Sequence, residues 1–405
     1  MTSAGQRVDL TDRSVLMLVW TGVATDTRVL REATTLVSAG ARVHIIGRAV
    51  PDAFEPPAGV SVESGGRAPL SAGRSRQLTP PERMARWALL PRHVAKRMGA
   101  WQAEALGLAR AWAASNGRPD LVHVHDFSAL PTGHTLSAEW GVPLIYDTHE
   151  YWVGRPVEGR RAPLLRRREA RSEDALVRDA TAVITVGAGV ANALRADHTT
   201  WPEITVVRNT FPLRDDLPPP GEEQPSEHPT DPPRRLVYGG RLAAYRELEV
   251  IASASERSAL PITALGPADD EWLRTFHAKA VEVLPAEPLT ALDARLRDAG
   301  AALVTHSDAW LNHRLAMPNK LFHAVSLGLP VVATDVGDLG ALVREHGLGT
   351  LYAPGDADGL VRAIDELLEH HSTFVVAAAA ARATLSWSAD SDALLRVYGG
   401  VLEAS

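Results

Sequence analysis

The stretch from Pro318 to Asp335 constrains the fold more than any other part of the 405-residue chain. It opens with Pro-Asn-Lys, runs through helix-like apolar positions to Gly328, and continues at once into Leu-Pro-Val-Val-Ala. Proline suits the first turn of a helix, where its missing N–H costs nothing, and glycine can end a helix in the left-handed conformation. The short β-branched run that follows is typical of a parallel strand covered on both faces. The sequence therefore predicts a helix that leads into a buried strand of an α/β sheet.

The polar start of this predicted helix is a candidate anion site. Unpaired backbone N–H groups of a first helical turn attract negative charge, and Asn319 and Lys320 lie in that turn. A phosphate group would suit such a position. The alternative is one more helix packed on a sheet, with Lys320 in solvent, because a fold alone does not give a function.

Composition narrows the class of protein. With 45% hydrophobic and 22% charged residues, the chain has the composition of a soluble globular protein, and its length predicts two to three domains. A formal net charge of −7 opposes general nucleic-acid binding. The absence of cysteine excludes disulfides and thiolate metal sites. The sequence shows neither an apolar leader nor a continuous apolar span of about 18 residues, so we expect a cytoplasmic protein.

Short apolar runs alternate with amphipathic helices through both halves of the chain, as in doubly wound α/β domains. Residues 212–233 are rich in proline and acidic side chains without apolar periodicity, and they are predicted to form a linker. Residues 48–80 carry scattered Pro, Gly and Ser and are predicted to form a loop. The predicted strands are 14–20, 42–47, 120–125, 143–146, 182–187, 204–208, 235–238, 261–265, 281–284, 301–305 and 329–333.

In the first half, candidate residues stand where predicted strands end, which is where α/β sheets bind ligands. The first such loop contains Gly22 but lacks the G-x-G-x-x-G pattern of dinucleotide sites, so Gly22 is a weak candidate. His125 ends one strand, and His149 and Glu150 follow another. His149 or Glu150 could orient a substrate hydroxyl or take its proton. Glu150 could equally cap the following segment.

The H-x-H pair of His123 and His125 permits a metal-site hypothesis. Alternate strand residues share a face, so both rings point the same way. No second metal-spaced set of His or Asp follows, and we expect no bound metal. We expect His123 to be a core histidine bonded to backbone.

In the second half, Gly239 and Gly240 follow a predicted strand and allow backbone N–H groups to approach a ligand. Arg241 and Arg246 supply positive charge beside this turn, so the segment is a candidate diphosphate site. The alternative is that both arginines form surface ion pairs.

A predicted helix at about 81–115, broken at Pro91, carries basic and aromatic residues, and a second basic cluster lies at 160–171. Such a helix can lie on an anionic membrane surface, although a solvated basic face is the simpler interpretation. The residues concerned are Arg83, Arg86, Trp87, Leu90, Arg92, Lys96, Arg97 and Trp101 in the helix, and Arg160, Arg161, Arg166, Arg167, Arg168 and Arg171 in the cluster.

Several of these segments together resemble the GT-B glycosyltransferases, especially the retaining family-4 type. The segment MPNKLFHAVSLGLPVVATD at 317–335 resembles the family's donor-binding motif, and DTRVLREATTLVSAGARVHIIG at 26–47 resembles its opening. The segments at 122–126, 147–150 and 239–246 resemble its H-x-H-D/E, D-x-H-E and G-R-L-x-x-x-K-G motifs.

The resemblance also shows two departures from the family pattern. The family's ribose-binding Glu corresponds to His323, and its partner acid corresponds to Leu315. Arg246 stands at the family's Lys position and Glu247 at its Gly position, while Leu284 falls where the family contacts the nucleotide base through backbone.

The resemblance implies two Rossmann-like α/β domains facing a cleft. The implied division is an acceptor-binding domain at 1–211, the linker at 212–233, a donor-binding domain at 234–386 and a C-terminal helix at 387–405 that crosses back to the first domain. Acceptor groups would come from the first half of the chain and donor groups from the second.

The implied activity is that of a hexosyltransferase, which moves a sugar from a nucleoside-diphosphate sugar to a hydroxyl of a glycan, lipid-linked or natural-product acceptor. Transfer would proceed with retention, without metal and without a cofactor. The implied catalytic residues are His125, His149, Glu150, Arg241 and Arg246, and the implied donor-binding residues are Gly22, Gly240, Arg241, Arg246, Leu284, Asn319, Lys320 and His323. A peripheral contact with the inner membrane face is possible under this hypothesis. A non-catalytic auxiliary subunit and a sugar-nucleotide epimerase of the same fold remain alternatives.

Overall fold

The computed structural model of the chain divides into two compact units, which are described separately. Unit 1 comprises residues 1–186, 191–207 and 391–405, and unit 2 comprises residues 187–190 and 208–390. None of the helices in the described ranges is long and apolar enough to cross a membrane. The predicted domain boundaries stay predictions. The structure describes residues 8–65, 80–155, 162–218, 220, 231–315, 317 and 319–404, without the side chains of 80–91.

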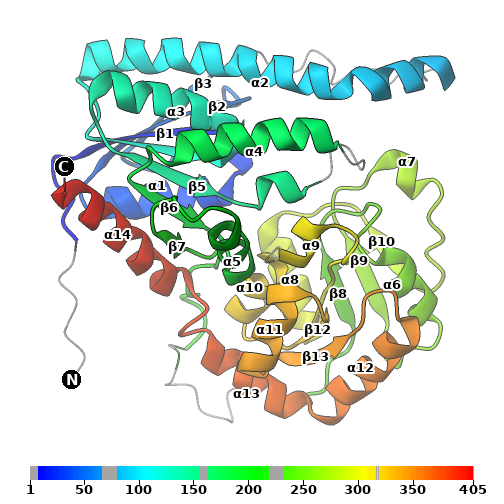
Figure 1. Cartoon of the computed structure of the whole chain (residues 1–405). Coiled ribbons are helices and arrows are strands. Elements are labelled where there is room, and N and C mark those ends of the chain that lie inside the picture. The colour runs from blue at the N-terminus through cyan, green and yellow to red at the C-terminus, as the bar shows by residue number, and fades with distance from the viewer. Residues whose placement is uncertain are drawn as a thin grey trace. The chain divides into compact units, whose positions relative to one another are not determined.

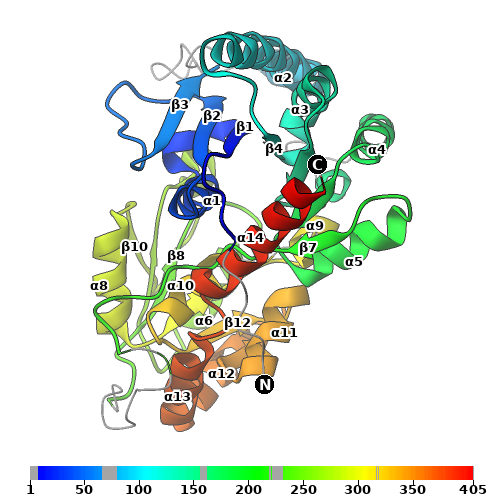
Figure 2. The ribbon, with the colours of Figure 1, turned by 90° about the vertical axis from the view of Figure 1, so that its left-hand side faces the viewer.

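Unit 1 is built on a seven-stranded parallel sheet in the order β3-β2-β1-β4-β5-β6-β7. Its central strands are buried throughout, because helices cover both faces and leave no polar side. Figure 2 shows the first three strands with the first helix packed beside them. The strands are β1 Ser14–Gly22, β2 Arg42–Arg48, β3 Val60–Ser64, β4 Leu121–His125, β5 Leu144–Thr148, β6 Ala182–Thr185 and β7 Ile204–Val206.

The helices of unit 1 lie on both sides of this sheet, with α2, α3 and α4 above it in Figure 1 and α1 and α14 below. Helix α1 buries an apolar stripe but also two charged side chains, Arg28 and Glu32. The helical segments are η1 Val23–Thr25, α1 Thr27–Ser38, α2 Pro80–Asn116, α3 Asp126–Trp140, η2 Trp152–Gly154, α4 Pro163–Val177, α5 Ala188–Asp197 and α14 Trp387–Glu403, the last two of which each have a few residues in unit 2.

Unit 2 repeats the architecture with a six-stranded parallel sheet in the order β10-β9-β8-β11-β12-β13. The strands are β8 Leu236–Gly239, β9 Ile262–Leu265, β10 Glu282–Leu284, β11 Ala302–Val304, β12 Val331–Thr334 and β13 Gly349–Tyr352. The helices are α6 Leu248–Ser255, α7 Asp270–Leu273, α8 Leu289–Ala299, α9 Leu311–Leu315, α10 Asn319–Ser326, α11 Gly337–His346, α12 Ala357–Glu369 and α13 His371–Ala381.

Strand β12 shows why this sheet is buried on both faces. Its alternate residues Val331 and Ala333 join the core beneath α10 and α11, whereas Val332 joins the core beneath α6 and α12. The predicted helix-to-strand unit is therefore confirmed. Gly328 follows α10 with φ +68°, the left-handed conformation expected of a helix-ending glycine.

The two sheets place their candidate sites at equivalent points. Strand order reverses between β1 and β4 in unit 1, and between β8 and β11 in unit 2. In doubly wound sheets a crevice opens at such a reversal, at the carboxyl ends of the strands. The predicted α/β class with two parallel sheets is confirmed.

Three local predictions were wrong. The predicted loop at 48–80 contains β3, whose Val-Ser-Val-Glu alternation suits a half-exposed edge strand paired with β2 alone. The predicted break at Pro91 does not occur, since α2 is one continuous helix. Residues 356–381, whose sequence predicts a single long helix, instead form two helices, α12 and α13, which meet at His370.

Candidate functional site

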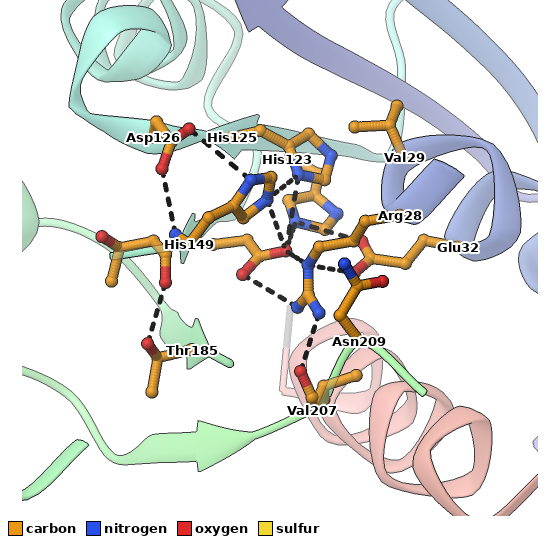
Figure 3. A network of polar contacts seen from close by, with 12 residues as sticks. Arg28, Val29, Glu32, His123, His125, Asp126, His149, Thr185, Val207 and Asn209 are labelled. Carbon is orange, nitrogen blue, oxygen red and sulfur yellow. Dashed lines mark hydrogen bonds and ion pairs between the residues drawn. The ribbon is translucent and has the colours of Figure 1, made fainter. Parts of the chain in front are cut away.

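In unit 1, charged side chains gather where β4 and β5 end and α1 passes beside them (Figure 3). Arg28 lies at the centre and is fully enclosed. Its Nε and Nη2 atoms donate to Oδ2 and Oδ1 of Asp147 at 2.9 and 3.0 Å, and its Nη1 donates to the carbonyl of Val207 at 2.7 Å. Arg28 Nε also lies 2.9 Å from Glu32 Oε1, one helical turn along. A single guanidinium thus holds two buried carboxylates.

Burial and this guanidinium set the charges of the two acids. Burial alone would raise the pKa of Asp147, but Arg28 and His149 outweigh it and hold the pKa well below its usual range. Burial dominates at Glu32 and, despite Arg28, raises its pKa to about 8. At neutral pH Asp147 is therefore ionised, whereas burial opposes the charged form of Glu32.

His149 lies between two carboxylates. Its Nδ1 is 3.5 Å from Asp126 Oδ2, and its Nε2 is 3.5 Å from Asp147 Oδ2 and 3.1 Å from His125 Nδ1. Its side chain is 20% exposed. Burial would lower the pKa of His149, but Asp126 and Asp147 outweigh it and raise the pKa to about 10. Both carboxylates therefore favour the protonated form of the ring.

The other two histidines of the cluster are fully enclosed and neutral. Burial lowers the pKa of His125 and lowers that of His123 further. His123 Nδ1 is 2.6 Å from the hydroxyl of Tyr398 on α14, so it is the core histidine that was expected, but its partner is a side chain. The Nε2 atoms of His123 and His125 have no hydrogen-bond partner within the described part of the chain.

Glu32, His123, His125 and Asp147 have the donor types of a metal site and lie within 4.8 Å of one another. We do not assign them as metal ligands. The guanidinium of Arg28, 2.9 Å from an oxygen of each acid, already supplies the positive charge that these carboxylates require.

The remaining predicted residues of unit 1 lie near this cluster but have other partners. Glu150 forms an ion pair with Arg155, whose guanidinium stacks 3.5 Å above the ring of Trp152. Gly22 ends β1 with an ordinary backbone conformation, and a Cβ there would meet nothing closer than 3.5 Å. Neither observation tests a role toward substrate.

In unit 2, Arg241 and Arg246 follow β8, and Lys320 of α10 packs against Gly240, the residue before Arg241. Arg246 acts electrostatically on Lys320. The side chains of Arg241, Arg246 and Lys320 form no hydrogen bond or ion pair with any residue that the structure describes. Lys320 Nζ lies 4.9 Å from the ring centroid of Tyr238, and a Cβ on Gly240 would come within 2.4 Å of Lys320 Cε. Many other arginines of this unit are paired with acids: Arg214, Arg234, Arg235, Arg257, Arg295, Arg297, Arg344 and Arg362.

Burial is the main influence on the protonation of Lys320 and His306, and neighbouring cations add to it. Burial, and then Arg246, lower the pKa of Lys320 to about 7. Burial also lowers the pKa of His306 to about 3, with His313, Lys320 and Arg246 adding to the effect. The Nδ1 of His306 is buried without a partner within the described ranges. A basic cluster that lacks a counter-ion is the electrostatic signature of an anion site.

A cavity of about 300 Å³ in unit 2 is lined by the residues on either side of Arg246, with three acids in its lining and none of the three cations. The loop that bounds it has two non-glycine residues in the left-handed region, Tyr245 at φ +63° and Glu247 at φ +60°. The carboxylate of Glu247 accepts from the N–H of Gly355 at 2.7 Å. The lining residues are Tyr245, Glu247, Glu249, Val250, Ser307, Asp308, Ala309, Pro354 and Gly355.

His323, predicted at the ribose position, is buried on α10. Its Nε2 is 2.6 Å from Asp293 Oδ1, its ring stacks on Phe211 at 4.8 Å, and Asp293 also pairs with Arg214. This pairing engages Nε2 of His323, and a role toward the donor stays a prediction.

Two other predicted donor-site residues of unit 2, Asn319 and Leu284, form hydrogen bonds within the unit. Asn319, at the exposed start of α10, accepts from the side chain of Asn209 at 2.9 Å. Leu284 ends β10, and its carbonyl accepts from the N–H of Gly266 at 3.4 Å. Pro318 lies outside the described residues.

Sequence reasoning missed Arg28, Glu32, Asp126 and Asp147 as parts of the site. The signal available for the first two was a pair of opposite charges four residues apart on the apolar face of α1, where a charge needs a partner. For Asp126 and Asp147 the signal was their place as the acids of the H-x-H-D/E and D-x-H-E motifs, although the left-handed backbone of Asp126, φ +61°, is visible only in the structure.

Two family models match the chain. One, described as a glycosyl transferase 4-like domain, matches residues 22–210, and the other, described as glycosyl transferases group 1, matches residues 233–370. Glycogen synthase of Mycobacterium tuberculosis is 27% identical over 392 residues, covering 90% of this chain and 88% of that protein. D-inositol 3-phosphate glycosyltransferase of Mycobacterium marinum is 28% identical over 317 residues, covering 73% and 66%.

Solved structures show the same fold. Sucrose-phosphate synthase of Thermosynechococcus elongatus superposes with a TM-score of 0.69 at 16% identity, covering 97% of this chain and 100% of its own. The Anabaena protein HepE, in complex with UDP-glucose, gives a TM-score of 0.64 at 16% identity, covering 96% and 99%. At these identities the likeness shows the architecture alone.

Proposed function

The chain belongs to the GT-B glycosyltransferases of the group 1 type, and we propose that it transfers a sugar from a nucleoside-diphosphate sugar to an acceptor hydroxyl. The observation that carries the proposal is the cluster of Arg241, Arg246 and Lys320 at the strand-order reversal of unit 2. A diphosphate supplies the negative charge that these cations lack. The structure of HepE with UDP-glucose makes a uridine donor the first candidate.

The proposed mechanism assigns the leaving group to these cations. As the glycosidic bond to the diphosphate breaks, negative charge grows on the departing oxygen, and preorganised positive groups stabilise that charge. Arg241 and Arg246 would hold the diphosphate through charge-assisted hydrogen bonds. Lys320, with a pKa of about 7 in the free protein, would take up a proton as the anion approaches.

We propose that transfer needs neither a metal ion nor a cofactor, because three side chains supply the positive charge toward the diphosphate. Retention of configuration follows the family resemblance of the donor motif. Dialysis against EDTA is expected to leave activity unchanged, and NMR of the first product formed reports the anomer. Restoration of a lost activity by added Mg²⁺ would contradict the metal-independent mechanism.

The acceptor is proposed to bind beside the imidazolium of His149, at the edge where β4 and β5 end. His149 is the member of this cluster whose ring is partly exposed, whereas His125 is enclosed. A hydroxyl that approaches this edge would meet a positively charged ring.

A peripheral contact with an anionic membrane is a further part of the proposal. Arg92, Lys96 and Arg97 are exposed on α2, and Arg167 and Arg168 are exposed on α4. Leu164 is 80% exposed beside them in the sequence. Basic residues with an apolar side chain suit a membrane surface. Co-sedimentation with vesicles that contain anionic lipid, and none with neutral vesicles, is the expected result.

The donor proposal is tested by a thermal-shift screen of UDP, GDP, TDP and ADP with wild type and Arg241→Ala. A nucleotide at about 100 times its Kd stabilises the folded protein by about 2.7 kcal/mol, which is a shift of several degrees. One base is expected to stabilise wild type and to lose most of its effect with Arg241→Ala. No shift with any nucleotide would contradict the donor site. Conversion of the sugar nucleotide in an assay without acceptor would instead indicate a sugar-nucleotide epimerase.

A further inference from the structure

His149 has acidic groups opposite both of its ring nitrogens, and the two acids come from different strand ends. Asp126 faces Nδ1 from the end of β4, and Asp147 faces Nε2 from β5. We propose that Asp126 is a positioning residue whose carboxylate, opposite that of Asp147, fixes the His149 ring and keeps it as an imidazolium that donates hydrogen bonds. This inference rests on the proposed function only where it concerns acceptor transfer.

The backbone places Asp126 for this role. Asp126 has φ +61°, a left-handed conformation that Asp and Asn tolerate better than other non-glycine residues. Its Oδ1 accepts from the backbone N–H of His149 at 3.0 Å, while its Oδ2 lies 3.5 Å from the ring Nδ1 of the same residue. One carboxylate therefore holds both the backbone and the ring of His149.

The charges around His149 favour the protonated ring. The groups that face it are Asp26 ahead of α1, Arg28 and Glu32 on α1, His123, His125 and Asp126 on or at the end of β4, and Asp147 on β5. Asp26, Asp126 and Asp147 are carboxylates that face one guanidinium, whereas burial opposes the charged forms of Glu32, His123 and His125. Protonation of His149 reduces the excess negative charge, which is why its pKa is raised to about 10 in spite of burial.

The protonated ring also has a defined contact at its second nitrogen. With protons on both nitrogens of His149, its Nε2–H faces His125 Nδ1 at 3.1 Å and Asp147 Oδ2 at 3.5 Å. His125 Nδ1 itself lies 3.4 Å from Asp147 Oδ2. The consequence for transfer is that His149 has no free lone pair at neutral pH. It supplies positive charge and a hydrogen bond at the acceptor edge, and it does not take the proton of the acceptor hydroxyl.

The test is an NMR titration of ¹⁵N-histidine-labelled protein, comparing wild type with Asp126→Asn. Asparagine tolerates the left-handed backbone, and its oxygen can still accept from the N–H of His149, so the substitution removes charge and keeps the fold. His149→Gln assigns the resonance. The matched control is Asp179→Asn, which removes a carboxylate 2.8 Å from the Nε2 of the partly exposed His134 in the same unit.

The expected result is that His149 stays protonated to about pH 10 in wild type. In Asp126→Asn its midpoint falls by roughly one to three pH units, the range for loss of a nearby opposite charge. Asp179→Asn leaves the midpoint where it was. A wild-type midpoint near 6.5, or equal midpoints in wild type and Asp126→Asn, overturns the proposal.

The pH profile of kcat provides a second readout. With a cationic His149, wild-type kcat is level through neutral pH, and Asp126→Asn brings the alkaline loss of activity to lower pH. A wild-type kcat that rises through about pH 6 to 7, with the rise abolished in His149→Gln, identifies a general base and overturns the proposal. The NMR titration needs no donor or acceptor, so a failure of the proposed function leaves it interpretable.

Discussion

The ends of the central strands hold a charged cluster in both units, but only the cluster in unit 1 is internally compensated. There the guanidinium of Arg28 contacts Glu32 and Asp147, and Asp126 and Asp147 compensate His149. In unit 2, Arg246 and Lys320 have no described acid beside them. A buried network with its counter-charges inside supports the fold and fixes geometry. A cluster without them is ready for a ligand that carries the missing charge, and the following variants test that contrast.

The largest effect on the free energy of unfolding is expected from Arg28→Ala. Removing one partner of a buried ion pair leaves uncompensated charge, and such changes cost about 3 to 5 kcal/mol. Urea denaturation monitored by circular dichroism measures the loss in the free energy of unfolding. A loss of under about 1 kcal/mol would show that Arg28 does not hold this cluster together.

Arg246→Ala is expected to weaken nucleotide binding and to leave the free energy of unfolding almost unchanged. Its side chain forms no hydrogen bond or ion pair with the residues that the structure describes, so the free energy of unfolding is expected to stay within about 0.5 kcal/mol of wild type. Affinity for a nucleoside diphosphate is expected to fall about 10- to 100-fold, because a hydrogen bond to a charged group contributes about 1.5 to 3 kcal/mol.

The matched control for Arg246→Ala is Arg344→Ala, which removes an exposed arginine of unit 2 that pairs with Asp335 at 2.6 Å. It should leave nucleotide affinity unchanged. Equal loss of affinity in the two variants would mean that general positive charge, and not this cluster, attracts the nucleotide.

The two clusters should change the free energy of unfolding in opposite directions as the pH rises. The folded protein holds a proton on His149 between the unfolded pKa of 6.5 and about 10, so this group makes the free energy of unfolding fall as pH rises through that window. The unfolded chain holds a proton on Lys320 between about 7 and 10.5, so Lys320 makes the same free energy rise.

Denaturation at several pH values therefore distinguishes two variants. Relative to wild type, Asp126→Asn should reduce the alkaline fall, and Lys320→Met should remove the alkaline rise. The same direction of change in both variants would contradict the assignment of opposite protonation shifts.

The smallest effect on stability is expected from Glu247→Gly. Glycine adopts φ +60° without the steric cost that other residues meet there, although it is more flexible when unfolded and loses the bond to Gly355. A net stabilisation of no more than about 1 kcal/mol is expected by thermal denaturation. A clear destabilisation would show that the carboxylate of Glu247 organises the loop beside the cavity.

Sequence predicted the parts of each site that lie at strand ends. His125 and His149 in unit 1, and Gly240 and Arg241 in unit 2, follow directly from where apolar runs stop. Those positions need only local periodicity, and the structure places them at the carboxyl edges of their sheets.

Partners distant in sequence could not be predicted in the same way. The amphipathic pattern of α1 identified its apolar positions, but the inward direction of Arg28 depends on Asp147, 119 residues away. His323 was assigned from its place in a motif, whereas its neighbour Asp293 lies 30 residues earlier on another helix. Nor does sequence show that Arg246 lacks an acid, since that requires the position of every carboxylate.

The most direct test of the unit 2 cluster as the donor's diphosphate site is calorimetric titration of wild type with UDP at about pH 8, in buffers of different ionisation heat. Lys320, with a pKa of about 7 in the free protein, is then mostly neutral. A bound diphosphate should raise that pKa, so binding is expected to take up a proton in wild type and not in Lys320→Met. Binding of UDP with no proton uptake in wild type, or with the same uptake in Lys320→Met, would contradict the account.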